Sequence, residues 1–138
     1  MKNLELLSGT NDIGGEEIYW ELVRDAEAGT ADQRPVVVLS HGAGGSHAAW
    51  YQQVPVIGQH FRVLTWDSRG FGNSTNRTGQ LAPTNAANDL AAVLDHLEIS
   101  EAHLVGQSMG GWHVSAFLSL FSERVTSVTY ADTVGGLW

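Results

Sequence analysis

An alternation of apolar and polar residues runs from Glu16 to Val23. Ile18, Trp20 and Leu22 fall on one face of this segment, and the intervening glutamates and tyrosine fall on the other. A period of two is typical of a half-buried antiparallel strand. Residues 24–34, which follow, are polar and are expected to form a loop. The first predicted element of the chain is therefore an antiparallel strand.

Continuous apolar runs follow and have a different pattern. Pro35 to Leu39 has no polar face, which suits a strand covered on both sides. Further strand-like runs recur with helix-length segments between them, at residues 61–66, 102–105 and 125–132. Strand alternating with helix indicates right-handed βαβ crossovers. The pattern predicts an α/β fold with a mostly parallel sheet flanked by helices.

Three segments are predicted to be helical. Thr84 is a candidate cap for a helix whose apolar stripe comprises Leu90, Val93, Leu94 and Leu97, at i, i+3, i+4 and i+7. A second helix follows Ser108. Residues 46–58 are a weaker prediction, because Pro55 interrupts them. No repeat or linker divides the chain, so we expect one domain over residues 1–138.

Composition narrows the possible partners. Fifteen acidic residues against seven basic ones give a formal net charge of -8, and Lys2 is the only lysine. This balance argues against binding to nucleic acid or to anionic membrane surfaces. There is no signal-peptide pattern or apolar run of membrane-spanning length, so a soluble cytoplasmic protein is expected. No cofactor is predicted, since dinucleotide and P-loop glycine patterns are absent, and no histidine pair has metal-ligand spacing.

The sharpest chemical signal is Gly-Gln-Ser-Met-Gly-Gly at residues 106–111, between a predicted strand and a predicted helix. This is the G-x-S-x-G pattern of a nucleophile elbow in its strand-turn-helix context. The tight turn exposes the Ser108 hydroxyl, and only glycine avoids collision two residues to either side. The amino end of the helix also places a positive dipole near negative charge that develops during attack.

Two further motifs follow buried strands in the right order. These are His-Gly-Ala-Gly-Gly at residues 41–45 and Asp-Ser-Arg-Gly-Phe-Gly-Asn-Ser at residues 67–74. Together with the elbow, they make the whole chain resemble the α/β-hydrolase superfamily, particularly its lid-bearing esterases, lactonases and carbon-carbon bond hydrolases. The resemblance implies the amino-terminal part of that fold, with the chain ending where the lid would begin.

The resemblance also implies roles for individual residues. Ser108 would be the nucleophile, and the backbone N–H groups of Met109 and Ala43 would form the oxyanion hole. Gly42 and Gly44 would let the backbone approach the substrate closely. Trp112, just past the elbow, is the tryptophan best placed to line a substrate cavity. The five tryptophans (Trp20, Trp50, Trp66, Trp112 and Trp138) could surround one pocket, although large aromatics are more often core.

The acid and base of a catalytic triad are less clear from the sequence. Asp132 ends the last predicted strand, a position from which some family members take the triad acid. His41 is expected to shape its loop, as in the family, and the remaining histidines to pack or face solvent. Asp67 and Arg69 are expected to brace the loop that follows their strand.

A serine needs an adjacent base, and in this family the base is a histidine that comes after the last strand. The chain ends before that point, which leaves three explanations: a separate chain holds the remainder, the sequence is truncated, or two copies complete each other's sheet through the open edge. The first two are favoured, because an identical partner also lacks the histidine. The expected function is hydrolysis of a small ester, lactone or carbon-carbon bond through an acyl-serine intermediate. A small-ligand-binding module and an inert fragment are the alternatives.

Overall fold

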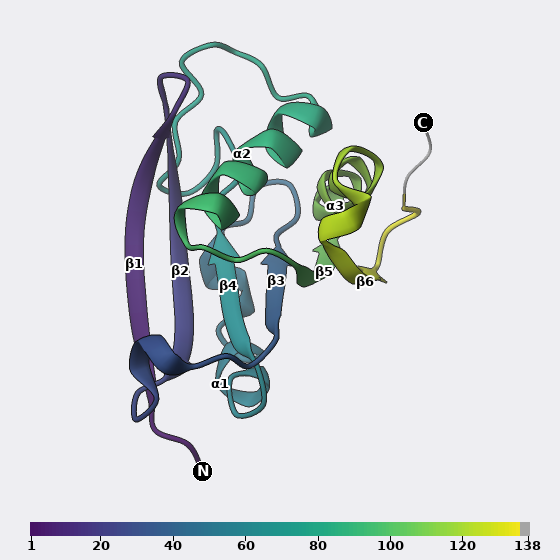
Figure 1. Cartoon of the computed structure of the whole chain (residues 1–138). Helices are drawn as coiled ribbons and strands as arrows, with labels where there is room; N and C mark the ends of the chain where they lie inside the picture. The colour runs from purple at the N-terminus through teal and green to yellow at the C-terminus, as the bar shows by residue number, and fades with distance from the viewer. Residues whose placement is uncertain (136–138) are drawn as a thin grey trace.

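The computed structural model describes residues 1–135 and is built on one sheet of six strands in the order β1-β2-β4-β3-β5-β6 (Figure 1). The strands are β1 (Leu4–Ile13), β2 (Glu16–Asp25), β3 (Val36–Ser40), β4 (Arg62–Trp66), β5 (Ala102–Gln107) and β6 (Val125–Ala131). The four strands β4, β3, β5 and β6 are parallel, whereas β1 and β2 are antiparallel to their neighbours. The predicted α/β class and mostly parallel sheet are confirmed.

The first strand was not predicted. β1 pairs with β2 along its whole length, from Leu4 opposite Asp25 to Ile13 opposite Glu16. The turn between them consists of Gly14 and Gly15, whose φ values are +61° and +88°. Positive φ at both central positions is the geometry of a two-residue hairpin, and a Gly-Gly pair between strands is its sequence signal.

Helices cover both faces of the sheet. The helices α2 (Pro83–His96) and α3 (Met109–Leu120) pack over one face (Figure 1). The other face carries the shorter elements η2 (His47–Trp50) and α1 (Val54–Ile57). Two one-turn 3₁₀ helices, η1 (Gly29–Ala31) and η3 (Ser122–Arg124), complete the connections. No helix within residues 1–135 is long and apolar enough to cross a bilayer.

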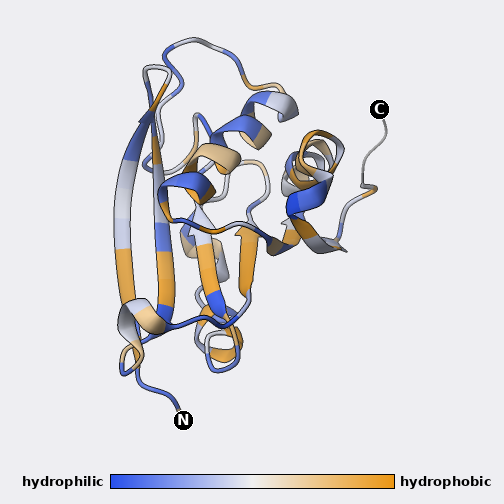
Figure 2. Cartoon of the chain, in the orientation of Figure 1, coloured by the Kyte–Doolittle hydropathy of each residue, from blue (hydrophilic) through white to orange (hydrophobic). Residues whose placement is uncertain are grey.

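The centre of the sheet is apolar on both sides. Every residue of β3 is buried. Val36 and Val38 enter the core under α2 and α3, whereas Val37 and Leu39 enter the core under α1. Figure 2 shows β3 as hydrophobic along its length. Burial on two faces is therefore the reason that this run has no polar side.

Two predicted helix positions need correction. α2 begins at Pro83 with Ala82 as its cap, before the predicted cap Thr84. Proline suits the first turn of a helix because its missing N–H would have no partner there. The weakly predicted helix over residues 46–58 is divided into η2 and α1, with Pro55 in the first turn of α1.

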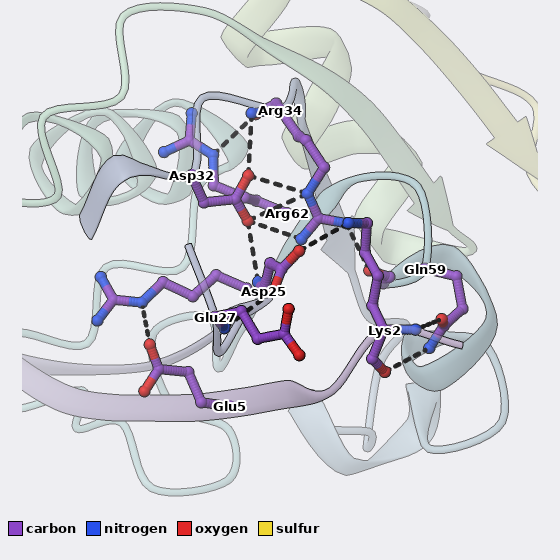
Figure 3. Close-up of polar contacts among 10 residues, drawn as sticks. Lys2, Glu5, Asp25, Glu27, Asp32, Arg34, Gln59 and Arg62 are labelled. Carbon is purple, nitrogen blue, oxygen red and sulfur yellow. Dashed lines mark hydrogen bonds and ion pairs between the residues drawn. The ribbon is translucent and has the colours of Figure 1, made fainter. Parts of the chain in front are cut away.

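A polar cluster fastens the hairpin to the amino ends of the parallel strands (Figure 3). Arg34 makes an ion pair with buried Asp32 at 2.6 Å, and Asp32 accepts a hydrogen bond from the backbone N–H of Asp25 at 2.9 Å. Asp25 in turn binds Lys2 at 2.7 Å. The hydrogen bonds from Arg34 hold the pKa of Asp32 well below its usual range. This cluster lies at the sheet end opposite the carboxyl ends of the parallel strands.

Candidate active site

Ser108 stands alone between the last residue of β5 and the first residue of α3. Its backbone has φ 51° and ψ −120°, a conformation that non-glycine residues rarely adopt. Such strain costs about 1–3 kcal/mol and persists only where the surroundings impose it. The side chain is exposed. The strand-turn-helix geometry predicted for the elbow is confirmed.

The glycines around Ser108 are required by backbone contacts. A Cβ atom on Gly106 would lie well under 3.0 Å from the carbonyl oxygen of Gly110. A Cβ atom on Gly110 would come equally close to the carbonyl oxygen of Ser40, at the end of β3. Real Cβ atoms essentially never approach so closely. The elbow therefore packs backbone on backbone against the neighbouring strand.

A cavity of about 350 Å³ opens beside the elbow. It is lined by Ala43, Ser108, Met109, Trp112, Asp132, Thr133 and Val134. Five of the seven residues predicted for the site thus share one cavity. Gly42 is not among the lining residues but abuts the elbow, since a Cβ atom there would lie 3.1 Å from that of Ser108. Gly44 is exposed, has φ +74°, and also lies outside the lining.

The residues that follow β6 form one wall of this cavity. The backbone N–H of Ser108 donates to the carbonyl oxygen of Ala131 at 3.2 Å, so the elbow is hydrogen-bonded to β6. Asp132 follows with φ +50°, which turns the chain toward the cavity. Aspartate tolerates this region better than most residues. Its assignment as the triad acid stays a prediction.

His41 anchors the start of the loop that carries Ala43. The ring is 1% exposed; Nδ1 lies 2.7 Å from the carbonyl oxygen of Gly42, and Nε2 accepts the backbone N–H of Ser68 at 3.1 Å. A carbonyl can only accept, so Nδ1 carries the proton and the imidazole is neutral. Burial lowers the pKa of His41, in agreement with this. The predicted structural role of His41 is confirmed.

His47 and Asp67 form a contact that the sequence did not indicate. Asp67 is fully buried and accepts hydrogen bonds from the backbone N–H of His47 at 2.6 Å and from its Nδ1 at 2.9 Å. The two residues are 20 positions apart, and they meet because the carboxyl ends of β3 and β4 are adjacent. That adjacency was the only available signal.

The predicted bracing by Asp67 and Arg69 is confirmed. Asp67 also accepts the backbone N–H of Asn73 at 2.8 Å, which folds the loop after β4 back on the strand. Arg69 makes a two-pronged ion pair with Asp89 of α2, with N···O distances of 2.9 and 2.7 Å. Asp89 is 1% exposed, and its burial raises the pKa of its carboxyl group.

The remaining histidines and tryptophans do not gather at the cavity. No histidine is among its lining residues within the described chain, and His113 of α3 is buried in the core. Trp20 and Trp66 belong to the core under α2 and α3, and Trp50 lies on the other face. Only Trp112, which is 48% exposed, lines the cavity, and Trp138 falls outside the described residues. One shared tryptophan pocket is therefore ruled out for the four described tryptophans.

Nothing in residues 1–135 brings together three histidine, cysteine or acidic side chains that could hold a metal ion. The arrangement offers instead a strained serine beside a partly apolar cavity that Ala43 and Met109 also line. These are the parts that an acyl-transfer site uses.

Comparison with known proteins gives consistent results. The chain is 34% identical over 111 residues to 3-oxoadipate enol-lactonase 1 of Acinetobacter baylyi, covering 78% of this chain and 40% of the lactonase. It is 33% identical over 125 residues to the dihydrolipoyllysine-residue acetyltransferase component of the acetoin cleaving system of Pseudomonas putida, covering 90% of this chain and 32% of that protein. The chain thus spans well under half the length of these curated relatives.

Among solved structures, the fold matches the enol-lactonase from Burkholderia xenovorans LB400 with a TM-score of 0.79 and 28% identity, over 87% of this chain and 45% of the lactonase. The family model described as alpha/beta hydrolase fold matches residues 35–137. That match includes residues 41–46, the loop that follows β4, and the elbow. This chain belongs to the α/β-hydrolase family.

Proposed function

We propose that this chain carries the nucleophile and oxyanion hole of a serine hydrolase that acts on a small ester or lactone. The observation that carries the proposal is the strained backbone of Ser108, at φ 51°, on the wall of a cavity that Ala43 and Met109 also line. Strain of this kind is retained where it serves a function. Relatives named as enol-lactonases support the substrate class.

In the proposed reaction, Oγ of Ser108 attacks the substrate carbonyl carbon while a base removes the hydroxyl proton. The carbonyl oxygen becomes an oxyanion that accepts hydrogen bonds from the backbone N–H groups of Ala43 and Met109. Loss of one such donor typically costs about 3 kcal/mol in the barrier. The C–O bond then breaks, the leaving alcohol takes the proton, and water hydrolyses the acyl-serine ester.

No histidine of residues 1–135 lines the cavity. In this proposal the base is therefore supplied by polypeptide other than these residues. A continuation of the chain or a second chain could supply it. Asp132 on the cavity wall is the candidate acid that orients this base. The side chains of Met109, Trp112 and Val134 favour a substrate with an apolar acyl portion.

The test is denaturing intact-mass analysis of the protein, isolated with any polypeptide that accompanies it, after exposure to a fluorophosphonate. We expect one adduct on the wild type and on Ser119→Ala, a matched change at an exposed serine of α3, and none on Ser108→Ala. Hydrolysis of a p-nitrophenyl ester should be lost in parallel. Activity and labelling that persist in Ser108→Ala would refute the proposal.

A binding module is the second candidate, favoured by the absence of a histidine from the cavity lining of the described residues. A folded protein that takes up no fluorophosphonate, but binds a small lactone without releasing product, would establish this alternative.

A further inference from the structure

The oxyanion loop, defined here as residues 41–46, has little stiffness of its own. Three of its six residues are glycines, and Gly44 has φ +74°. Within the loop, the only backbone hydrogen bond is from the N–H of Gly45 to the carbonyl oxygen of Gly42, at 3.1 Å. Glycine gives up more conformational freedom on ordering than any other residue. The position of the Ala43 N–H therefore depends on how the ends of the loop are held.

Both ends of the loop are held by two consecutive residues that follow β4. At the start, Nε2 of His41 accepts the backbone N–H of Ser68 at 3.1 Å. Just past the other end, Asp67 accepts the backbone N–H of His47 at 2.6 Å and its Nδ1–H at 2.9 Å. Asp67 and Ser68 are both buried. His41 and His47 thus connect the two ends of this loop to the buried residues Asp67 and Ser68.

His47 has a second carboxylate on its other side. Its Nε2 lies 3.3 Å from Oε1 of Glu21 on β2, and the same oxygen accepts the hydroxyl of Tyr19 at 2.7 Å. The Tyr19 ring packs against the imidazole with centroids 4.9 Å apart. The His47 side chain is only 18% exposed. Both ring nitrogens therefore face carboxylates, Asp67 just after β4 and Glu21 on β2. The other titratable groups near the ring are Tyr19 and the neutral His41.

We propose that His47 is a positioning residue that fixes the oxyanion loop, through its bond to Asp67, where the Ala43 N–H can reach the oxyanion. The inference rests on the proposed hydrolase function and assigns that site a residue away from the reacting atoms. Hydrogen bonds to an ionised carboxylate are shorter and stronger than neutral ones. Oxyanion-hole donors act only when they lie about 2.7–3.1 Å from the developing charge. A tether of this kind acts on the transition state and leaves substrate affinity largely unchanged.

Three substitutions separate the two contacts of the ring. His47→Asn keeps an N–H donor near the Nδ1 position and retains the bond to Asp67. His47→Gln reaches the Nε2 position and retains only the contact with Glu21. His47→Ala removes both, and His60→Ala, an exposed histidine, is the control. The backbone N–H of His47 is present in every variant, so the side chain alone is tested.

Two measurements are made on each variant: amide hydrogen exchange of residues 42–46, and kcat and KM for a p-nitrophenyl ester. For His47→Ala and His47→Gln we expect exchange in the loop to rise about tenfold and kcat to fall about tenfold, with KM within about twofold of wild type. His47→Asn and His60→Ala should match wild type in both measurements.

The outcomes distinguish failure of this inference from failure of the proposed function. Unchanged exchange in His47→Ala would overturn the tether, and so would exchange that rises equally across β2 and β4, because His47 would then only support the fold. Faster loop exchange in a protein whose wild type, isolated with any polypeptide that accompanies it, has no esterase activity and takes up no fluorophosphonate would support the tether and refute the hydrolase proposal. Faster loop exchange with unchanged kcat would overturn the positioning role.

Discussion

His113 makes the stability of this fold depend on pH between 6.5 and about 4. The side chain is 4% exposed, packs 6.2 Å from the Trp66 ring, and leaves Nδ1 without a hydrogen-bond partner among residues 1–135. Burial, with a smaller contribution from His41, lowers its pKa from 6.5 to about 4. The charged imidazolium is therefore strongly disfavoured in the folded protein.

The sign and size of the effect follow from this pKa. Below pH 6.5 the unfolded chain binds a proton at His113 that the folded chain does not bind until about pH 4. The contribution of His113 to the free energy of unfolding is thus fully present above pH 6.5, and it decreases as the pH drops toward about 4. At about 1.4 kcal/mol for each factor of ten, the whole effect is about 3 kcal/mol, of which about 2 kcal/mol is lost by about pH 5.

The assay is urea unfolding of wild type and His113→Gln at about pH 7 and about pH 5. Glutamine does not titrate. The drop in the free energy of unfolding from about pH 7 to about pH 5 should therefore be about 2 kcal/mol smaller in the variant than in wild type. Comparing the two losses cancels the cost of the substitution itself. Equal losses in the two proteins would refute the assignment of this pH dependence to His113.

Two further predictions concern backbone packing and a buried ion pair. Gly110→Ala should lower the free energy of unfolding by about 3 kcal/mol, because its Cβ would collide with the carbonyl oxygen of Ser40. Gly79→Ala should lower it by only about 1 kcal/mol, because nothing lies within 4 Å of its Cβ and the cost comes from φ +70° alone. Similar urea midpoints for these two variants would contradict the collision. Asp89→Ala leaves Arg69 without its carboxylate partner and should cost about 3 kcal/mol in the same assay. The double variant Arg69→Met/Asp89→Leu should be closer to wild type, and equal losses in the single and double variants would count against this reading.

Local patterns made much of the fold predictable. The apolar run before Ser40 identified a two-sided strand, and the glycines around Ser108 identified the elbow, because both signals lie within a few neighbouring residues. Five of the predicted site residues then met in one cavity, because parallel strands bring their carboxyl ends to the same edge of the sheet. Strand order explains why motifs far apart in the chain converge.

Interactions between distant segments were harder to predict. The strand β1 buries little of its own surface, and its pairing with β2 is what makes it a strand. Gly14 and Gly15 marked the hairpin, but the weak alternation before them hid it. The contact between His47 and Asp67 depends on the register of β3 and β4, which no local pattern encodes.

The close backbone contacts at the elbow make the position of Ser108 independent of which side chains fill the apolar cores. Gly106, Gly110 and the carbonyl oxygen of Ser40 meet without any side chain between them. A substitution in the apolar cores can therefore change how stable the protein is while Ser108 keeps its place against β3. For the proposed hydrolase, substrate preference can in turn change through Trp112 and Val134, which line the cavity. The scaffold thus allows stability and selectivity to evolve along separate routes around a fixed point.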